Sequence, residues 1–194
     1  MLRLAVLISG SGTDLQSIID HRNQINGEIA LVISNRKNAY GLQRAQDAGI
    51  KNLVIKNQDE LLNTLKEEKI DFIVLAGYLA ILGKELIDTY QNKIINIHPS
   101  LIPSFCGPGM YGLHVHEAVL ERGVKVSGAT VHFVSEEVDG GPIIWQEAVS
   151  IADLDTPEDI QKRVLEVEHK ILPEVVQWIC DGKVVIEKGR VKIR

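Results

Sequence analysis

An amide and an imidazole stand close together near the middle of the chain. Asn96 and His98 are two positions apart in the run Asn-Ile-His-Pro-Ser, and alternate side chains of an extended segment share one face. Ile95 and Ile97 would then pack behind them. Pro99 lacks a backbone N–H and favours extended geometry in the residue before it, so the predicted strand ends there and leaves His98 at its carboxyl end. Open α/β sheets keep their binding sites at such strand ends.

A carboxylate some forty positions later would complete this pair. Asp139 lies in the run Val-Asp-Gly-Gly-Pro, which is typical of a turn. If Asp139 reaches His98, we expect it to raise the pKa of the imidazole above its ordinary value of ~6.5. An amide donor beside a charged imidazole is suited to stabilising an oxyanion. Taken singly, His98 is more readily explained as a structural histidine and Asp139 as a turn residue, so the hypothesis depends on their being paired.

These motifs, with others in the same order, resemble the folate-dependent formyltransferases. The similarity covers almost the whole chain and is strongest to the branch of that family that formylates glycinamide ribonucleotide. It rests on residues 4–12, 75–78, 96–103, 128–134 and 168–169.

The resemblance implies an enzyme that transfers a formyl group from the cosubstrate 10-formyltetrahydrofolate to the amine of 5-phosphoribosylglycinamide. The products would be formylglycinamide ribonucleotide and tetrahydrofolate, in de novo purine biosynthesis. It also implies catalytic roles for three residues. Asn96 would donate to the formyl oxygen, while His98, ion-paired with Asp139, would stabilise the same charge and handle protons. Neither a covalent intermediate nor a metal is implied.

A glycine-rich turn follows the first apolar run of the chain. Gly10, Ser11 and Gly12 precede Thr13, and Thr13-x-x-Gln16 has the form of a capping box, which would place free backbone N–H groups at a helix start. A phosphate fits such a site, although a plain strand-to-helix turn explains the glycines equally well. A dinucleotide site is less compatible, because the third glycine of that motif is missing. The resemblance implies that Gly10, Ser11, Gly12 and Thr13 bind the phosphate of the ribonucleotide.

One carboxylate lies at the edge of the apolar stripe of the last long predicted helix. Glu168 comes four residues after Val164 and three before Ile171. From the sequence alone, a boundary glutamate paired with a lysine or arginine explains it as well. The resemblance implies that Glu168 binds the ribonucleotide.

Two segments are expected to form the folate pocket. Residues 79–82 have the periodicity of ordinary helix residues, and residues 135–138 alone suggest only a solvated turn. By resemblance, the folate-binding residues are Leu79, Ala80, Ile81, Leu82, Asn96, Ser135, Glu136, Glu137, Val138 and Asp139.

Two departures from the family pattern concern this pocket. Many relatives carry basic residues at the positions of Ala80 and near Gln58, where the glutamate tail of folate would pass, and here only Lys56 offers a substitute. The loop from Ser104 to Gly112 is also longer than the common family version. Its nine residues include three glycines and one proline, with apolar side chains between them. This composition suits a mobile lid over the substrates and a tolerated insertion equally well.

The composition is typical of a single domain. With 194 residues, 45% of them hydrophobic, the chain can bury one core, which we divide into a ribonucleotide-binding half at about 1–98 and a half at about 99–194 that completes the folate and catalytic site. The net charge of -5 and the absence of basic runs argue against a nucleic-acid partner. No apolar stretch approaches the ~20 residues that span a membrane. The first apolar run is too short for a signal peptide. We therefore expect small-molecule substrates only, and a cytoplasmic monomer or homodimer.

The cysteines and histidines give little support to a metal site. Cys106 and Cys180 have no metal-ligand spacing and are predicted to be free thiols. His114 and His116, with His98 or His132, would be the best candidate ligands. Side chains at i and i+2 diverge at a helix start, however, so no metal is expected.

Apolar runs alternate with amphipathic segments through the first half of the chain, as in parallel strands joined by right-handed crossover helices. The second half should contain a long loop at 99–112, a short helix at 114–122 and two strands that extend the sheet antiparallel. A long helix should follow, starting at Thr156-Pro157 and ending at Asp181-Gly182, and then a hairpin around Gly189. The predicted fold is therefore an α/β, Rossmann-like open sheet, mostly parallel, twisted, with helices on both faces. The expected strands are 4–8, 29–33, 52–55, 72–76, 94–97, 125–134 and 143–151, and the first four helices are 13–21, 39–48, 58–68 and 79–89.

Other functions remain compatible with the same residues. A formyltetrahydrofolate deformylase shares the Asn, His and Asp set, but typically has a further amino-terminal domain. A methionyl-tRNA formyltransferase needs a further carboxyl-terminal domain and a basic face. A non-catalytic nucleotide-binding module would need the phosphate loop without Asn96, His98 and Asp139 together.

Overall fold

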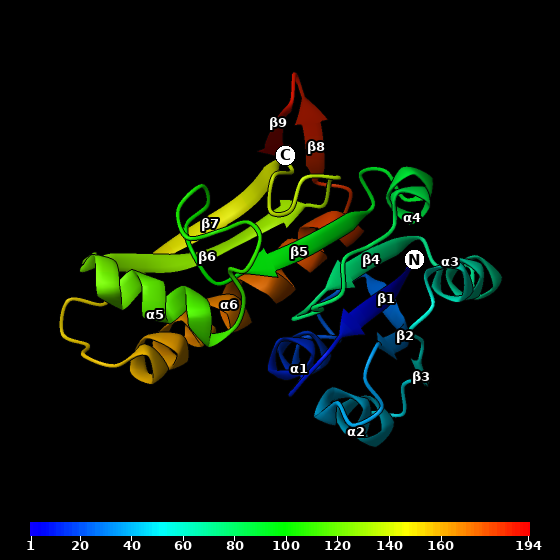
Figure 1. Ribbon diagram of the computed structural model, residues 1–194. Coiled ribbons are helices and arrows are strands. Elements are labelled where there is room, and N and C mark those ends of the chain that lie inside the picture. The colour runs from blue at the N-terminus through cyan, green and yellow to red at the C-terminus, as the bar shows by residue number, and fades with distance from the viewer.

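The computed structural model describes all 194 residues and is built on a seven-stranded sheet (Figure 1). Neighbouring strands pair parallel as far as the fifth, and the last two pair antiparallel, so the predicted fold class is confirmed. The spatial order is β3 (Asn52–Val54), β2 (Gly27–Ser34), β1 (Leu2–Ile8), β4 (Phe72–Leu75), β5 (Ile94–His98), β6 (Val126–Phe133) and β7 (Ile143–Ser150).

Helices cover both faces of this sheet, because its central strands bury alternate side chains on opposite sides. In β1, for example, Leu4, Val6 and Ile8 belong to one core cluster, whereas Ala5 and Leu7 belong to the other. The first cluster takes residues from α1, α2, α5 and α6, and the second takes residues from α3 and α4. The helices are α1 (Thr13–Asp20), α2 (Tyr40–Asp47), α3 (Gln58–Glu67), α4 (Lys84–Thr89), α5 (Leu113–Arg122) and α6 (Pro157–Cys180).

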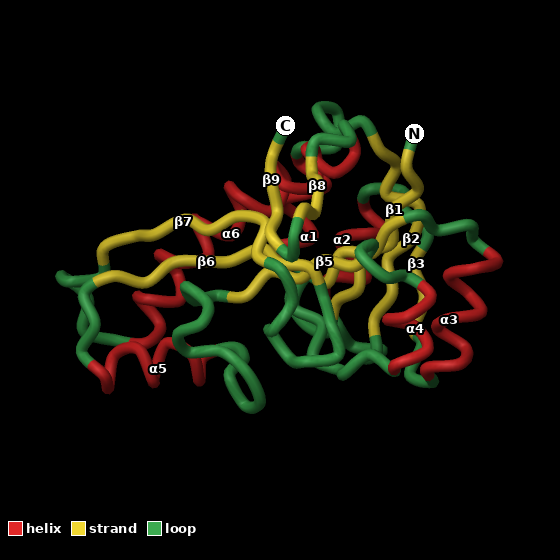
Figure 2. The backbone as a smooth tube through the Cα atoms, turned by 90° about the horizontal axis from the view of Figure 1, so that it is seen from above, coloured by secondary structure: helices red, strands yellow, loops and turns green.

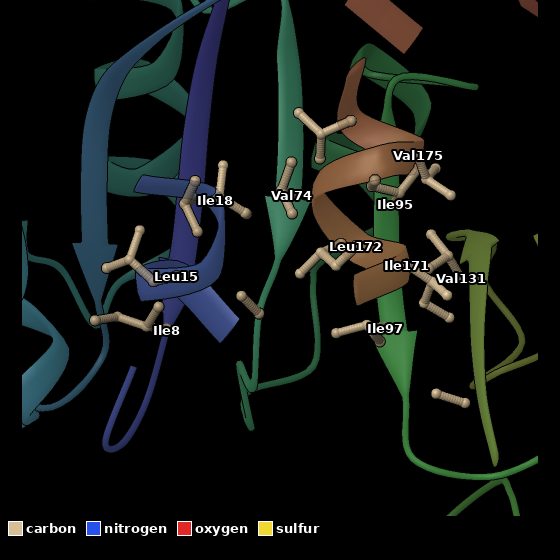
Figure 3. Packing of buried hydrophobic residues seen from close by; sticks show 14 of the residues in the cluster. Ile8, Leu15, Ile18, Val74, Ile95, Ile97, Val131, Ile171, Leu172 and Val175 are labelled. Carbon is tan, nitrogen blue, oxygen red and sulfur yellow. The ribbon is translucent and has the colours of Figure 1, made fainter. Parts of the chain in front are cut away.

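The longest helix, α6, lies across the sheet where its parallel and antiparallel parts join. The hydroxyl of Thr156 caps it, accepting a hydrogen bond from the N–H of Asp159, and Pro157 is its first residue, as predicted. Figure 3 shows Ile171 and Val175 of this helix packed toward Ile95 of β5 and its neighbours. Burial of each such side chain contributes ~1.5–3 kcal/mol to stability, so the packing of α6 against the sheet holds β5 in position.

One predicted helix start and one predicted helix cap are wrong. The fourth helix begins at Lys84 rather than at residue 79, because the backbone N–H groups of Leu79 and Gly83 donate instead to the side chains of Ser9 and Gln58. The capping box at the start of α1 is also absent. Gly12 caps that helix in the left-handed region, with φ 71°, and no side chain caps it.

The remaining features agree with the sequence patterns. The segment from Pro99 to Gly112 contains no helix or strand and forms a long loop between β5 and α5 (Figure 2). The chain ends in the predicted hairpin, β8 (Val184–Glu187) and β9 (Arg190–Ile193). None of the helices combines the length and apolar character that a membrane crossing requires.

Candidate active site

A cavity of about 390 Å³ opens at the carboxyl ends of β4 and β5. Three loops surround it: residues 77–82 after β4, residues 107–112 before α5, and residues 134–139 after β6. Asn96, His98 and Asp139 line it together, and so do all ten residues predicted to bind folate. The sheet therefore gathers in one place groups that stand as much as sixty positions apart in the sequence.

Asn96 projects from β5 beside His132, for which the residue spacing had suggested only a metal-binding role. Asn96 pairs with His132 across the β5–β6 ladder, and the two side chains meet with 3.2 Å between Asn96 Nδ2 and His132 Nε2. His132 Nδ1 lies 2.8 Å from the carbonyl oxygen of Phe133, which can only accept, so Nδ1 carries the proton. In the neutral ring, Nε2 then accepts from the Asn96 amide. His132 thereby sets which way the Asn96 amide faces.

His98 is the last residue of β5 and is held by the loop that follows it. Its Nε2 donates to the carbonyl oxygen of Phe105 across 2.8 Å. Its Nδ1 lies 3.6 Å from Asp139 Oδ2, a charge contact rather than a hydrogen bond. The predicted proximity of His98 and Asp139 is therefore confirmed.

Asp139 sits between the two histidines. Its other oxygen, Oδ1, lies 3.6 Å from His132 Nε2, and Oδ2 accepts the N–H of Gly107 across 2.9 Å. The backbone of Asp139 is in the left-handed region with φ 56°, which aims the side chain back toward the sheet. The side chain is only 9% exposed.

The predicted charge state of His98 is wrong. Burial lowers the pKa of His98 below its ordinary value and outweighs the opposing effects of the Phe105 carbonyl and the Asp139 charge. Burial also disfavours ionised Asp139, but the close contact with His132, the hydrogen bond from the Gly107 N–H and the charges of the two histidines together hold the pKa of Asp139 below its ordinary value. At neutral pH the site therefore contains a carboxylate facing a mostly neutral imidazole.

The long loop contributes both to the cavity and to the position of His98. Residues 107–112 form part of the cavity wall, and Phe105 and Met110 pack against the main core cluster. Ser100 Oγ donates to the carbonyl oxygen of Ser104 across 2.6 Å, and this hydrogen bond stabilises the first residues of the loop.

The two histidines of α5 face different surroundings, as their i and i+2 spacing predicts. His114 is exposed and meets the Tyr111 ring edge-on at 5.4 Å. His116 is 1% exposed, its Nδ1 has no partner, and burial, with a smaller effect of the His98 charge, lowers its pKa to about 4. The structure contains no cluster of three or more His, Cys, Asp or Glu side chains with the geometry of a metal site.

The predicted phosphate loop lies at the carboxyl end of β1, on the same edge of the sheet as the cavity. A Cβ atom on Gly12 would lie 2.5 Å from the Cα of Gly41, so only glycine fits there. The N–H of Gly41 donates to the carbonyl oxygen of Gly10, and Arg44 Nε donates to that of Ser11 across 2.7 Å. Gly41 and Arg44 gave no signal in the sequence, because α2 reaches the loop only through the fold.

A smaller hollow of about 260 Å³ lies beside this loop and has only polar walls. Glu168, from α6, is buried close to it and makes no ion pair with a lysine or arginine, so the alternative of a boundary pair is wrong. Burial and the charge of Asp14 hold the pKa of Glu168 well above its ordinary value. The hollow is lined by Thr13, Gln16, Ser17, Asp20, His21, Arg44 and His169.

No lysine or arginine lines the main cavity. Gln58 instead accepts the N–H of Gly83 across 2.9 Å, Lys56 is exposed, and Lys84 pairs with Glu136 at the rim. Both cysteines are free thiols, as predicted.

Comparison with known proteins identifies the class to which this site belongs. Residues 2–176 match the family described as "Formyl transferase", and the chain belongs to that family. Among solved structures, it is similar to glycinamide ribonucleotide transformylase 1 from Symbiobacterium toebii, with 43% identity and a TM-score of 0.93 over 100% of this chain and 94% of that one.

Two further relatives limit what the family alone implies. The chain is 41% identical to the chloroplastic phosphoribosylglycinamide formyltransferase of Arabidopsis thaliana over 94% of its own length, but it spans only 66% of that protein. A formyltetrahydrofolate deformylase from Pseudomonas syringae pv. tomato str. DC3000 shares the fold with a TM-score of 0.90 at 27% identity, over 99% of this chain and 65% of that one. The fold therefore does not by itself separate formyl transfer from formyl hydrolysis.

Proposed function

We propose that this chain transfers the formyl group of 10-formyltetrahydrofolate to the amine of glycinamide ribonucleotide, in de novo purine biosynthesis. One observation carries the proposal: a cavity lined by Asn96, His98 and Asp139 lies on the same edge of the sheet as the glycine turn at residues 10–13, where a helix begins. Ser9, which directly precedes that loop, accepts the N–H of Leu79 from the cavity wall across 2.8 Å. Because this hydrogen bond links the cavity wall to the loop, a ligand in the cavity and a phosphate on the loop would lie next to each other.

In the proposed complex the folate occupies the main cavity, whose walls are largely apolar. Its ring system would lie between residues 79–82 and residues 135–138 and would pair its polar edge with backbone groups there. The ribonucleotide phosphate would bind the loop at residues 10–13, with Glu168 near the ribose. Both substrates are small molecules, and we propose a cytoplasmic location.

The proposed reaction begins with attack of the substrate amine on the formyl carbon. A carbon–nitrogen bond forms, and charge develops on the formyl oxygen. Asn96, whose amide is oriented by His132, donates one N–H to that oxygen. Because His98 is mostly neutral and uses Nε2–H on Phe105, its Nδ1 is free to accept the amine proton.

The second half of the reaction returns that proton. The imidazolium formed at His98 is stabilised by the Asp139 carboxylate 3.6 Å away, and its positive charge in turn stabilises the oxyanion. The bond from the formyl carbon to N10 then breaks, and N10 receives the proton. A base that starts neutral serves these two proton transfers better than the ring with a raised pKa that the amino-acid sequence predicted.

A direct assay distinguishes transfer from hydrolysis. The protein is incubated with 10-formyltetrahydrofolate, with and without glycinamide ribonucleotide, and formylated ribonucleotide and free formate are both quantified. We expect tetrahydrofolate to appear only when the amine is present, in equal amount with formylated product. Formate release at the same rate without the amine would identify a deformylase instead, and binding without any product would identify a non-catalytic module.

A further inference from the structure

Two carboxyl groups without hydrogen-bond partners are buried beside the phosphate loop. Asp14 is the second residue of α1, and its side chain is 12% exposed; Glu168, on the packed helix α6, is 5% exposed. Oδ1 of Asp14 is fully buried and makes no hydrogen bond, and neither does any atom of the Glu168 carboxyl group. His169 Nε2 lies 3.5 Å from Asp14 Oδ1 but without hydrogen-bond geometry, and it too has no partner.

The surrounding charges do not compensate for this burial. The titratable and charged groups nearby are Asp20 and His21 on α1, Arg44 on α2, and Glu168 and His169 on α6. Arg44, the one fixed cation among them, donates to the Ser11 carbonyl and lies over the Tyr40 ring instead of pairing with Asp14. Burial therefore raises the pKa of Asp14 to about 7, and burial together with the Asp14 charge raises the pKa of Glu168 well above its ordinary value.

The start of α1 makes this pair sensitive to a phosphate. The N–H groups of Thr13, Asp14 and Leu15 have no intrahelical partner, because the first helical bond runs from Gln16 to the Gly12 carbonyl. They point to where an anion would bind. Asp14 belongs to this same first turn, so a dianion placed there adds negative charge close to its carboxylate and favours the protonated form.

We propose that Asp14 and Glu168 hold one proton between them in the free protein, and that a phosphoribosyl group binding at residues 10–13 draws in a second proton at Asp14. The neutral carboxyl group of Asp14 then donates a hydrogen bond to an oxygen of the ligand. Asp14 thus contributes to specificity: it repels a phosphate while ionised and binds it once protonated. The identity of the ligand rests on the proposed function, whereas the shared proton does not.

The proposal makes the affinity for phosphorylated sugars fall as pH rises. Ribose 5-phosphate is a suitable probe because its phosphate, with a second pKa of ~6, is already dianionic above pH 7, and it lacks the amine of the proposed substrate. For uptake of one proton, the dissociation constant should rise by up to tenfold between pH 7 and pH 8. Asp14→Asn keeps the shape of the side chain but is neutral at every pH, so its dissociation constant should change little over this range.

The test is a carboxyl ¹³C NMR titration with and without ribose 5-phosphate, together with binding measured at pH 7 and pH 8. Asp14→Asn and Glu168→Gln assign the two signals. Asp59→Asn is the matched control, because Asp59 is also the second residue of its helix, α3, but is exposed, and α3 packs in the other core cluster from α1. In the control, the pH dependence of binding should equal that of the parent protein.

Three results would overturn the inference. They are titration of both carboxyl groups below pH 5, no effect of ribose 5-phosphate on either signal, or the parent's pH dependence in Asp14→Asn. These outcomes are separate from the formyl-transfer assay. A protein that fails to transfer formyl groups can still show the shared proton, and an active enzyme can lack it.

Discussion

His116 offers a quantitative test of how burial controls charge near the active site. Its ring is 1% exposed, with a pKa lowered to about 4 by burial, whereas an unfolded histidine has a pKa of ~6.5. Between these values the unfolded chain binds more protons than the folded protein, so the free energy of unfolding falls as pH falls. From pH 7 to pH 5 this effect costs about 2 kcal/mol of stability.

Replacing His116 should remove that pH-dependent loss. We expect His116→Gln to lose about 2 kcal/mol less stability than the parent between pH 7 and pH 5, whatever its stability at pH 7. Urea unfolding at the two pH values measures the difference, and the opposite effect of Asp14 cancels because both proteins contain it. His114→Gln, two residues earlier on the same helix and exposed, is the control and should behave as the parent. An equal loss in His116→Gln and the parent would refute the reasoning.

The remaining predictions concern the catalytic groups and the loop. Asn96→Ala should lower turnover by ~10²–10³ while ribose 5-phosphate binding is retained, because an oxyanion donor acts mainly in the transition state; unchanged turnover would exclude that role. His98→Ala should abolish proton transfer and reduce turnover at least as much, measured in the same assay. Asp139→Asn should lower the pKa of His98 further, since the Asp139 charge now raises it, and shift the acidic limb of kcat/KM to lower pH; an NMR titration of His98 that matches the parent would contradict the contact. His132→Phe should reduce kcat with little change in KM, because the Asn96 amide loses its orienting acceptor. Removing residues 108–111, which leaves the Gly107 N–H that donates to Asp139, should raise formate release relative to transfer if the loop excludes water, and parent-like ratios would mean that it does not.

The sequence by itself determined the order of strands and helices and which side chains share a face of each strand. Apolar runs of strand length alternating with amphipathic segments can bury both faces of a parallel sheet, and the observed strands follow those runs closely. The spacing of Asn96 and His98 was sufficient to place both on one face of β5, because alternation along a strand is local geometry. The cap at Thr156 and the hairpin at Gly189 are local for the same reason.

Only the tertiary structure decided the electrostatics of the site. The acceptor of His98 is a backbone carbonyl at Phe105, and the group that orients Asn96 is a histidine on a neighbouring strand; neither residue type nor spacing encodes such contacts. The same holds for Gly41, which packs from α2 against Gly12 in the predicted phosphate loop. The sequence suggested a charged His98 because it revealed the carboxylate partner. Burial instead lowers the pKa of His98, and how deeply the ring is buried depends on every segment packed around it.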